Sequence, residues 1–412
     1  SVDHPRLRPL EVIPGQDGHG RRVLILRDPL HLSEAVLVVP LPLVPVLQRL
    51  DGRHTLAMIR EEIMAEHGMD VPEASLRQVA SQLEEARFLD GEGFAAWRLS
   101  VEREFLAAPV RPSFLAGRGY EADPATLRAR LDGFFTGPEG PGPPGLNGGA
   151  AVPLRALVAP HIDFHRGGPT FAWSYRALAE RGGADLFVVL GTVHAPTQGF
   201  YTLTEKAFET PLGTLEVDRA FTQALASRAP EDLFRDEFTQ RAEHSIELQA
   251  VFLQYLYGGR RPVMFVPLLV GSFGEFVVQG RSPRGDARVE GFVEALRRTL
   301  GEAGAAGRRA CLVASVDLAH VGPQFGDADP VDGERLAALE RADLASLEAT
   351  CRGDAEGFWW SVAEDGDARK VCGLAPIYTL LRTLDGCRGE VLRYSQWPDP
   401  NGTVTFCSVA IG

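Results

Sequence analysis

After residue 154 the sequence alternates between short, continuous apolar runs and longer stretches with helical periodicity. Each run has the length of a strand and is apolar on both faces, which indicates strands buried on both sides. Such strands separated by helices predict an α/β fold with a largely parallel sheet sandwiched by helices. The runs are LRALVAP, DLFVVLG, GFYTLT, PVMFVPLLV, ACLVASV, EVLRYS and TVTFCSVAIG, and helices are expected at 169–181, 218–227, 243–257, 287–300, 332–346 and 373–384.

The chain before this region is expected to form a separate small domain. A length of 412 residues favours two domains. The stretch at 134–153 is rich in Gly and Pro and poor in packing groups, as linkers are. We therefore expect a small domain at 1–100, a helical connector with a Gly/Pro-rich linker at 101–153, and a second domain at 154–412.

The small domain has the pattern of a winged-helix-like α+β unit. RRVLILRD and EAVLVVP read as strands, Thr55 and Pro72 each begin a helix, and FLDGEGFAAW reads as a wing. With its LDG at 50–52, TLAMIREEIMAEHG and LRQVASQLEEARFLD, the region resembles PqqD-like domains, which recognise leader peptides. The resemblance implies that an extended peptide adds to an open sheet edge. A packing domain that binds nothing is the alternative.

Composition excludes several partners. The formal net charge of −13 argues against a nucleic-acid or anionic membrane surface as the main partner, and the predicted third helix of the small domain is not basic. No apolar run is long enough to span a bilayer. The five cysteines form no Cys-x-x-Cys pair, so a disulfide framework is not expected and a reducing cytoplasm is the expected compartment.

Ionisable residues follow three of the predicted strands. His161 follows LRALVAP, His194 follows LFVVLGT, and Asp317 and His320 follow ACLVASV. Because the carboxyl ends of parallel strands share one edge of a sheet, these side chains are expected to converge in a crevice there. Taken singly, each histidine is more often structural than metal-binding, but their equivalent positions favour a common site.

Two further segments carry candidate residues. His244 stands between Glu243 and Glu247 at the start of a predicted helix, where it is either exposed beside helix-stabilising acids or an acid/base or supporting group in the crevice. Cys372 precedes another predicted helix, whose N-terminus would lower the thiol pKa; a buried, inert cysteine is the alternative.

The segment APHIDFHRGG offers a different donor set. His161, Asp163 and His165 alternate, and Gly167-Gly168 implies a loop after them. This spacing is similar to that of zinc-hydrolase motifs, although no second histidine-rich cluster follows.

Seven motifs in order resemble the Memo family, also named the B component of AmmeMemoRadiSam systems. They are APHIDF, VVLGTVHAP, FETPLGTLEVD, EHSIELQAVFLQYL, VPLLVG, SVDLAHVG and CGLAPIYTLL. The resemblance implies a class III extradiol dioxygenase-like fold with a pocket lined by His161, His194, Asp317, His320 and Cys372. It also implies that His161, His194 and Cys372 bind iron or copper. The related dioxygenases use two histidines and a carboxylate, so the cysteine puts ring cleavage in doubt, while Asp163 is an added carboxylate.

Together these features favour an Fe(II)- and O2-dependent oxidoreductase acting on a phenolic or peptide substrate recruited by the N-terminal domain. Asp317 would support a ligand or accept a proton, and His320 or His244 would be the general base. Copper and zinc are alternative metals, and a leader peptide and a radical-SAM protein are the expected partners. The competing readings are a metal-binding adaptor without turnover, and a zinc hydrolase using His161, Asp163 and His165.

Overall fold

The computed structural model describes residues 3–145 and 153–412. They form two compact units, divided between Ala107 and Ala108, and each is described by itself. Part of the predicted linker, 146–152, lies outside the described residues. The domain limits taken from the sequence stay a prediction.

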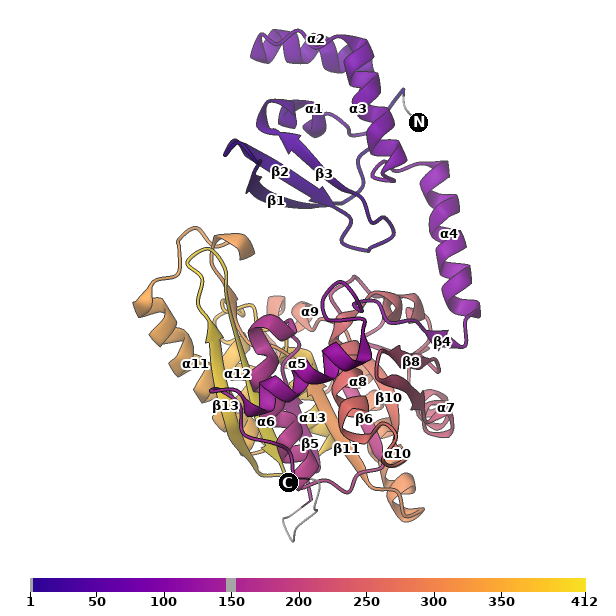
Figure 1. The fold of residues 1–412 in the computed structure, drawn as a ribbon, viewed down its shortest axis with the longest axis vertical. Coiled ribbons are helices and arrows are strands. Elements are labelled where there is room, and N and C mark those ends of the chain that lie inside the picture. The colour runs from indigo at the N-terminus through magenta and orange to yellow at the C-terminus, as the bar shows by residue number, and fades with distance from the viewer. Residues whose placement is uncertain (1–2, 146–152) are drawn as a thin grey trace. The chain divides into compact units, whose positions relative to one another are not determined.

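The first unit is a three-stranded antiparallel sheet, in the order β1-β2-β3, with helices packed against one face (Figure 1). Leu26 of β2 shares a buried cluster with Ile59 and Ile63 of helix α2. The Thr55 side chain caps α2 by accepting a hydrogen bond from the Met58 amide, as the sequence predicts. The elements are β1 Glu11–Gln16, β2 Arg22–Arg27, β3 Val36–Pro40, η1 Leu41–Leu43, α1 Val44–Gln48, α2 Leu56–His67, α3 Glu73–Glu85 and α4 Glu92–Ala107.

In this unit one strand was not predicted, and the predicted wing was wrong. Strand β1 was missed, because EVIPGQ contains both Pro and Gly and lacks an apolar run. The predicted wing instead leads into helix α4, where the spacing of Trp97, Val101 and Phe105 is helical. The Trp97 indole donates a hydrogen bond to the Leu32 carbonyl, 2.7 Å away, and so fixes α4 to the strand connection.

The second unit is built on a mixed sheet whose centre is parallel. The strand order is β12-β14-β5-β11-β6-β10-β9-β8-β4, with β13 paired to β14 and β7 to β10 (Figure 1). The four central strands β5, β11, β6 and β10 run parallel, and β14 is antiparallel to β5. The bounds are β4 Val110–Arg111, β5 Ala156–Ala159, β6 Leu186–Thr192, β7 Tyr201–Leu203, β8 Ala207–Thr210, β9 Gly213–Val217, β10 Met264–Val270, β11 Ala310–Ser315, β12 His320–Val321, β13 Gly389–Trp397 and β14 Thr403–Ile411.

Helices cover both faces of this sheet, so the predicted α/β class is confirmed. Alternate residues of β6 enter two separate clusters: Val188 packs with residues of α7, α10, α12 and α13, whereas Phe187 packs with residues of α5, α6 and α8. The remaining elements are α5 Pro124–Thr136, α6 Phe164–Glu180, α7 Arg219–Arg228, η2 Glu237–Arg241, α8 His244–Tyr257, α9 Gly274–Val278, α10 Ala287–Ala305, η3 Pro323–Phe325, α11 Gly333–Cys351, α12 Ala355–Ala363 and α13 Leu374–Thr383.

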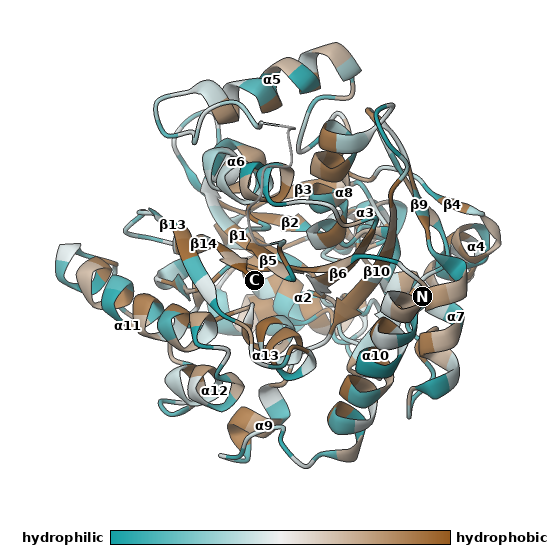
Figure 2. Cartoon of the chain, turned by 90° about the horizontal axis from the view of Figure 1, so that it is seen from below, coloured by the Kyte–Doolittle hydropathy of each residue, from teal (hydrophilic) through white to brown (hydrophobic). Residues whose placement is uncertain are grey.

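The distribution of hydropathy follows this layering. In Figure 2 the central strands β6 and β10 are hydrophobic along their length, whereas α10 has one hydrophobic and one hydrophilic side. Met264 apart, every residue of β6 and β10 is buried. No helix among the described residues combines the length and the apolar character needed to cross a bilayer.

The predicted loop after His165 is instead helical. Helix α6 begins at Phe164 and runs through Gly167, Gly168 and Pro169. A Cβ at Gly167 would collide with Ile162, and one at Gly168 with the Phe134 ring. The glycine pair therefore permits close packing inside a helix rather than marking a turn.

Candidate metal centre

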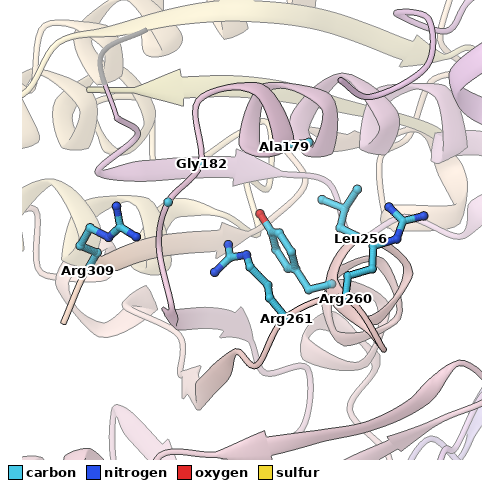
Figure 3. Close-up of a pocket in the computed structure, with 8 residues that line it drawn as sticks. Ala179, Gly182, Leu256, Arg260, Arg261 and Arg309 are labelled. Carbon is cyan, nitrogen blue, oxygen red and sulfur yellow. The ribbon is translucent and has the colours of Figure 1, made fainter. Parts of the chain in front are cut away.

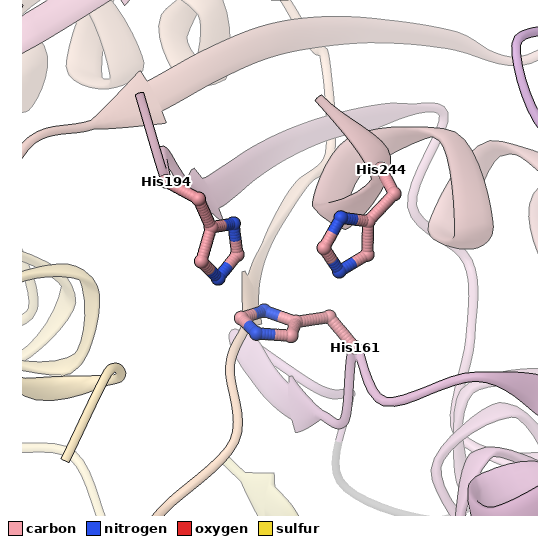
Figure 4. Close-up of side chains that lie close together, drawn as sticks. All are labelled: His161, His194 and His244. Atoms are coloured by element: carbon pink, nitrogen blue, oxygen red, sulfur yellow. The ribbon is translucent and has the colours of Figure 1, made fainter. Parts of the chain in front are cut away.

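Three histidines from distant segments meet at the carboxyl edge of the parallel strands. His161 follows β5, His194 follows β6, and His244 is the first residue of α8 (Figure 4). One ring nitrogen from each lies within 4.8 Å of those of the other two. The ring centroids are 5.0 Å apart for His161–His194 and His194–His244, and 5.3 Å for His161–His244. His161 is buried, whereas His194 is exposed, so the cluster opens to solvent on one side.

Glu243 holds two of these rings in place. Its carboxylate lies 3.0 Å from Nδ1 of His194 and 3.3 Å from Nδ1 of His244. It also accepts hydrogen bonds from the backbone amides of His194, at 2.9 Å, and Ser245, at 3.1 Å, and thereby caps α8. Since Nδ1 of each ring faces this carboxylate, Nε2 is left to act as a ligand.

His161 is fixed by the end of the neighbouring strand. Its Nδ1 donates a hydrogen bond to the Ser315 carbonyl, 3.0 Å away. The backbone amides of His161 and Ile162 donate to Oδ1 of Asp317, at 3.0 and 3.1 Å. The other carboxylate oxygen, Oδ2, lies 3.6 Å from Nε2 of His161. Asp317 therefore holds the loop that carries His161 and also places a carboxylate beside its free nitrogen.

The surroundings keep two of the three rings neutral at pH 7. Burial lowers the pKa of His161 to about 3 and that of His244 to about 4. Burial also disfavours the charged form of His194, but the Glu243 carboxylate outweighs it and raises the pKa of that ring. His194 in turn outweighs the effect of burial on Glu243 and lowers the pKa of the carboxyl. Neutral imidazoles are the form that binds metals.

Cys372 lies at the same edge, next to His161. Its sulfur is 3.5 Å from Nε2 of His161, and the thiol donates to the Asp317 carbonyl oxygen at 3.4 Å. A nitrogen and a sulfur bound tetrahedrally to one zinc ion stand about 3.6 Å apart, so this pair has the spacing of two ligands. The sulfur is nonetheless outside the group of donors that lie within 4.8 Å. Burial and the nearby Asp317 carboxylate raise the pKa of Cys372 well above its usual value, so the lowering expected from the helix N-terminus was wrong.

His320 is close enough to the cluster to interact electrostatically with His161, His194 and Asp317. Its Nδ1 is 3.2 Å from the Leu318 carbonyl and 3.3 Å from the Lys370 carbonyl, which leaves Nε2 as a proton acceptor. Its ring meets the Phe325 ring edge-on at 5.3 Å. Burial lowers the pKa of His320, so the ring is neutral at pH 7.

The predicted trio of His161, Asp163 and His165 is not brought together. The Asp163 side chain caps α6 through the Arg166 amide and also pairs with the Arg166 guanidinium at 2.6 Å. His165 is exposed, and its ring packs against Trp397 at 5.7 Å. Because Asp163 is engaged in capping, the structure gives no support to Asp163 as a metal ligand.

A buried ion pair that the sequence did not reveal supports the start of α8. Arg111 and Glu247 have fully buried side chains, joined at 2.7 Å. Arg111 also donates to the backbone carbonyls of Gln240 and Glu243, at 2.6 and 2.9 Å. Glu247 accepts from the Tyr120 hydroxyl, at 2.6 Å, among other donors. Arg111 is 136 residues from Glu247, and nothing in the local sequence marks the pairing.

A cavity of about 380 Å³ opens beside His194. Its walls come mainly from the loop after β6 and from the segments around Ser272 and Arg288. This volume lies in the range of small-molecule sites. Of the three clustered histidines, His194 lines this cavity, whereas His161 and His244 do not.

The residues around the cluster match a known family. Residues 111–406 match the model of the Memo-like protein family. The chain is 31% identical to a MEMO1 family protein of Methanopyrus kandleri over 300 residues, covering 71% of this chain and 94% of that protein. It is 31% identical to a MEMO1 family protein of Thermus thermophilus over 347 residues, covering 84% and 94%. A MEMO1 family protein of Aquifex aeolicus is 26% identical over 329 residues, covering 79% and 80%.

Proposed function

The chain belongs to the Memo family, and from this membership and the histidine cluster we propose that it is a non-haem iron oxidoreductase that uses molecular oxygen. One iron ion would be held by His161, His194 and His244, with Cys372 in reach as a further donor. The observation that carries the proposal is the convergence of three imidazoles whose Nδ1 atoms are engaged by Ser315 and Glu243.

The donor set fits such an ion. Imidazole nitrogen suits iron, copper and zinc, and Glu243 supplies the supporting carboxylate that orients metal-binding histidines. Three protein ligands leave coordination positions for other groups, on the side where His194 is exposed. When bound, iron would supply the one-electron chemistry that reactions of oxygen require.

The other residues of the crevice act on the substrate and its protons. The free Nε2 of His320 is a base that accepts the proton of a phenol. The Asp317 carboxylate, beside Nε2 of His161, orients the crevice and offers a second proton acceptor. The cavity beside His194 takes a substrate as small as a single phenolic ring, or one side chain of a peptide.

A metal-binding protein without turnover is the second candidate. The sulfur of Cys372, 3.5 Å from His161, favours it, because a fourth protein ligand would close the site to substrate and suit copper. The zinc hydrolase has no such observation in its favour.

Anaerobic loading of the full chain with Fe(II), followed by metal analysis and oxygen-consumption assays with catechols, tests the proposal. We expect one iron per chain, its loss in His194→Ala and His244→Ala, and retention in His165→Ala, which changes an exposed histidine outside the cluster. Iron binding without oxygen uptake would favour the second candidate. Full iron content in both cluster variants would refute the site.

The first unit is proposed to recruit a peptide, as in the PqqD-like domains that it resembles. Its edge strand β3 pairs only with β2 among the described residues, and Val36 and Val38 are more than half exposed. An extended peptide would add to this edge. Replacement of both valines by arginine should weaken the binding of a leader peptide, measured by fluorescence anisotropy, without changing the iron content. Unchanged peptide affinity would indicate that this unit has only a packing role.

A further inference from the structure

A second cavity lies at the opposite edge of the central sheet from the histidine cluster. Its volume is about 350 Å³, and it is lined by residues that directly precede three parallel strands. Gly182 and Gly183 come before β6, Arg260 and Arg261 before β10, and Arg309 before β11. The cavity also receives Leu256 and Tyr257 from the end of α8.

The cavity gathers arginines that have no carboxylate partner within ion-pair distance among the described residues. Figure 3 shows the guanidinium groups of Arg261 and Arg309 turned toward the same space beside Gly182, with Arg260 beyond Leu256. The acid closest in sequence to the glycines, Asp185, pairs with Arg308 instead, at 3.0 Å. Arg260 and Arg309 are exposed and Arg261 is partly buried, so an anion that enters the hollow meets solvent-accessible positive charge in a chain whose net charge is −13.

A buried hydroxyl provides a second, independent observation. The Tyr257 side chain is buried and lines this cavity. The Arg261 guanidinium lies beside its hydroxyl, but arginine can only donate, and the hydroxyl proton has no acceptor among the described residues. Buried polar groups nearly always have a partner, so a buried hydroxyl whose proton lacks an acceptor indicates a ligand that accepts hydrogen bonds. Burial outweighs the opposing effect of the nearby Arg261 cation and raises the pKa of Tyr257, so the hydroxyl keeps its proton and can donate.

The local geometry preorganises these donors. The Arg261 guanidinium carbon lies 4.2 Å from the centroid of the Tyr257 ring, and this contact restricts the position of the guanidinium group. Gly183 has a left-handed backbone with φ of 144°, and a Cβ there would stand 3.1 Å from Nη1 of Arg309. The absence of a side chain at this position lets Arg309 reach the cavity. The partial negative charge at the C-terminal end of helix α8 can explain why one arginine lies nearby. It explains neither the presence of Arg309 nor the Tyr257 hydroxyl.

We propose that this cavity, the arginine cavity, binds a phosphate group, free or carried by a small molecule, through Arg261, Arg309 and the Tyr257 hydroxyl. Two planar guanidinium groups and a hydroxyl match the several acceptor oxygens and double charge of phosphate. The volume suits a small phosphorylated compound rather than a polymer. This site is independent of the metal centre.

Isothermal titration calorimetry of the full chain with inorganic phosphate and with glycerol phosphate tests the proposal. We expect saturable binding at one site with a Kd below about 1 mM for at least one of the two. The tighter ligand tells whether free phosphate or a phosphate ester is preferred. Absence of saturable binding by either ligand up to about 10 mM would overturn the proposal.

Variants separate this site from nonspecific attraction. Arg309→Ala should weaken binding about tenfold or more, as expected for a charge-assisted contact, whereas Arg341→Ala, an exposed arginine on α11, should not. Tyr257→Phe should weaken binding and also raise the unfolding temperature of the free protein, because it removes an unsatisfied buried hydroxyl. Affinity unchanged in Arg309→Ala would overturn the assignment; His194→Ala should leave phosphate binding intact.

Discussion

Replacement of Glu243 by glutamine tests whether one carboxylate organises the histidine cluster. Glu243 is buried, and it faces Nδ1 of both His194 and His244. Glutamine has nearly the same shape, but it is uncharged and presents only one acceptor oxygen, so at most one of the two rings keeps its orientation. Loss of such a supporting group reduces metal affinity 10- to 100-fold in other sites, which corresponds to about 1.4–2.7 kcal/mol.

The assay is an anaerobic competition titration of Fe(II) against a chromophoric chelator. Glu237→Gln is the matched control, because Glu237 is nearby in sequence and its Oε1 accepts a hydrogen bond from Thr204, 2.7 Å away. We expect the Kd to rise 10- to 100-fold in Glu243→Gln and to stay unchanged in the control. Wild-type affinity in Glu243→Gln would refute the role of this carboxylate in holding the rings.

Three other perturbations test the supporting structure. Arg111→Met leaves the Glu247 carboxylate buried without its cation. Chemical denaturation should show that the free energy of unfolding falls by about 3–5 kcal/mol. A decrease below about 1 kcal/mol would contradict this role of the ion pair. Burial raises the pKa of Asp367 to about 6. The folded protein therefore binds more protons than the unfolded chain between about pH 4 and 6. As a result, this residue makes the free energy of unfolding fall as the pH rises through that window. Asp367→Asn should remove that dependence and stabilise the protein at pH 7 by about 1–2 kcal/mol, allowing for partial exposure; an unchanged pH profile would contradict it. A Cβ at Gly191 would lie 2.5 Å from Cγ1 of Ile246 and 2.7 Å from Oγ of Ser245. Gly191→Ala should therefore displace the start of α8, lower the free energy of unfolding by about 1–3 kcal/mol, and weaken iron binding. Unchanged iron affinity would show that the displacement does not reach His244.

The central strands could be predicted from the sequence because a strand buried on both faces must be apolar at every position. Strand β6, for example, is buried along its whole length. The hairpin of β8 and β9 was not predicted, because these strands are short and have exposed residues. Gly167 and Gly168 led to the wrong prediction of a loop for a different reason. Their role depends on close contacts with Ile162 and Phe134, which the local sequence does not reveal.

The convergence of His161 and His194 followed from their places after parallel strands, and the structure brings them together. The position of His244 within the group did not follow, because it depends on the Glu243 cap, which directs two rings at once. The adjacent Glu-His pair at a helix start was the available signal. Whether Cys372 is a ligand, and whether His320 and Asp317 take part in catalysis, stay predictions.

The X-ray absorption spectrum of the full chain loaded with one equivalent of iron tests the central claim most directly. The account predicts scattering from three imidazole rings bound to a single ion, and Glu243→Gln should reduce that contribution. A spectrum with oxygen ligands alone, and no imidazole contribution, would contradict it.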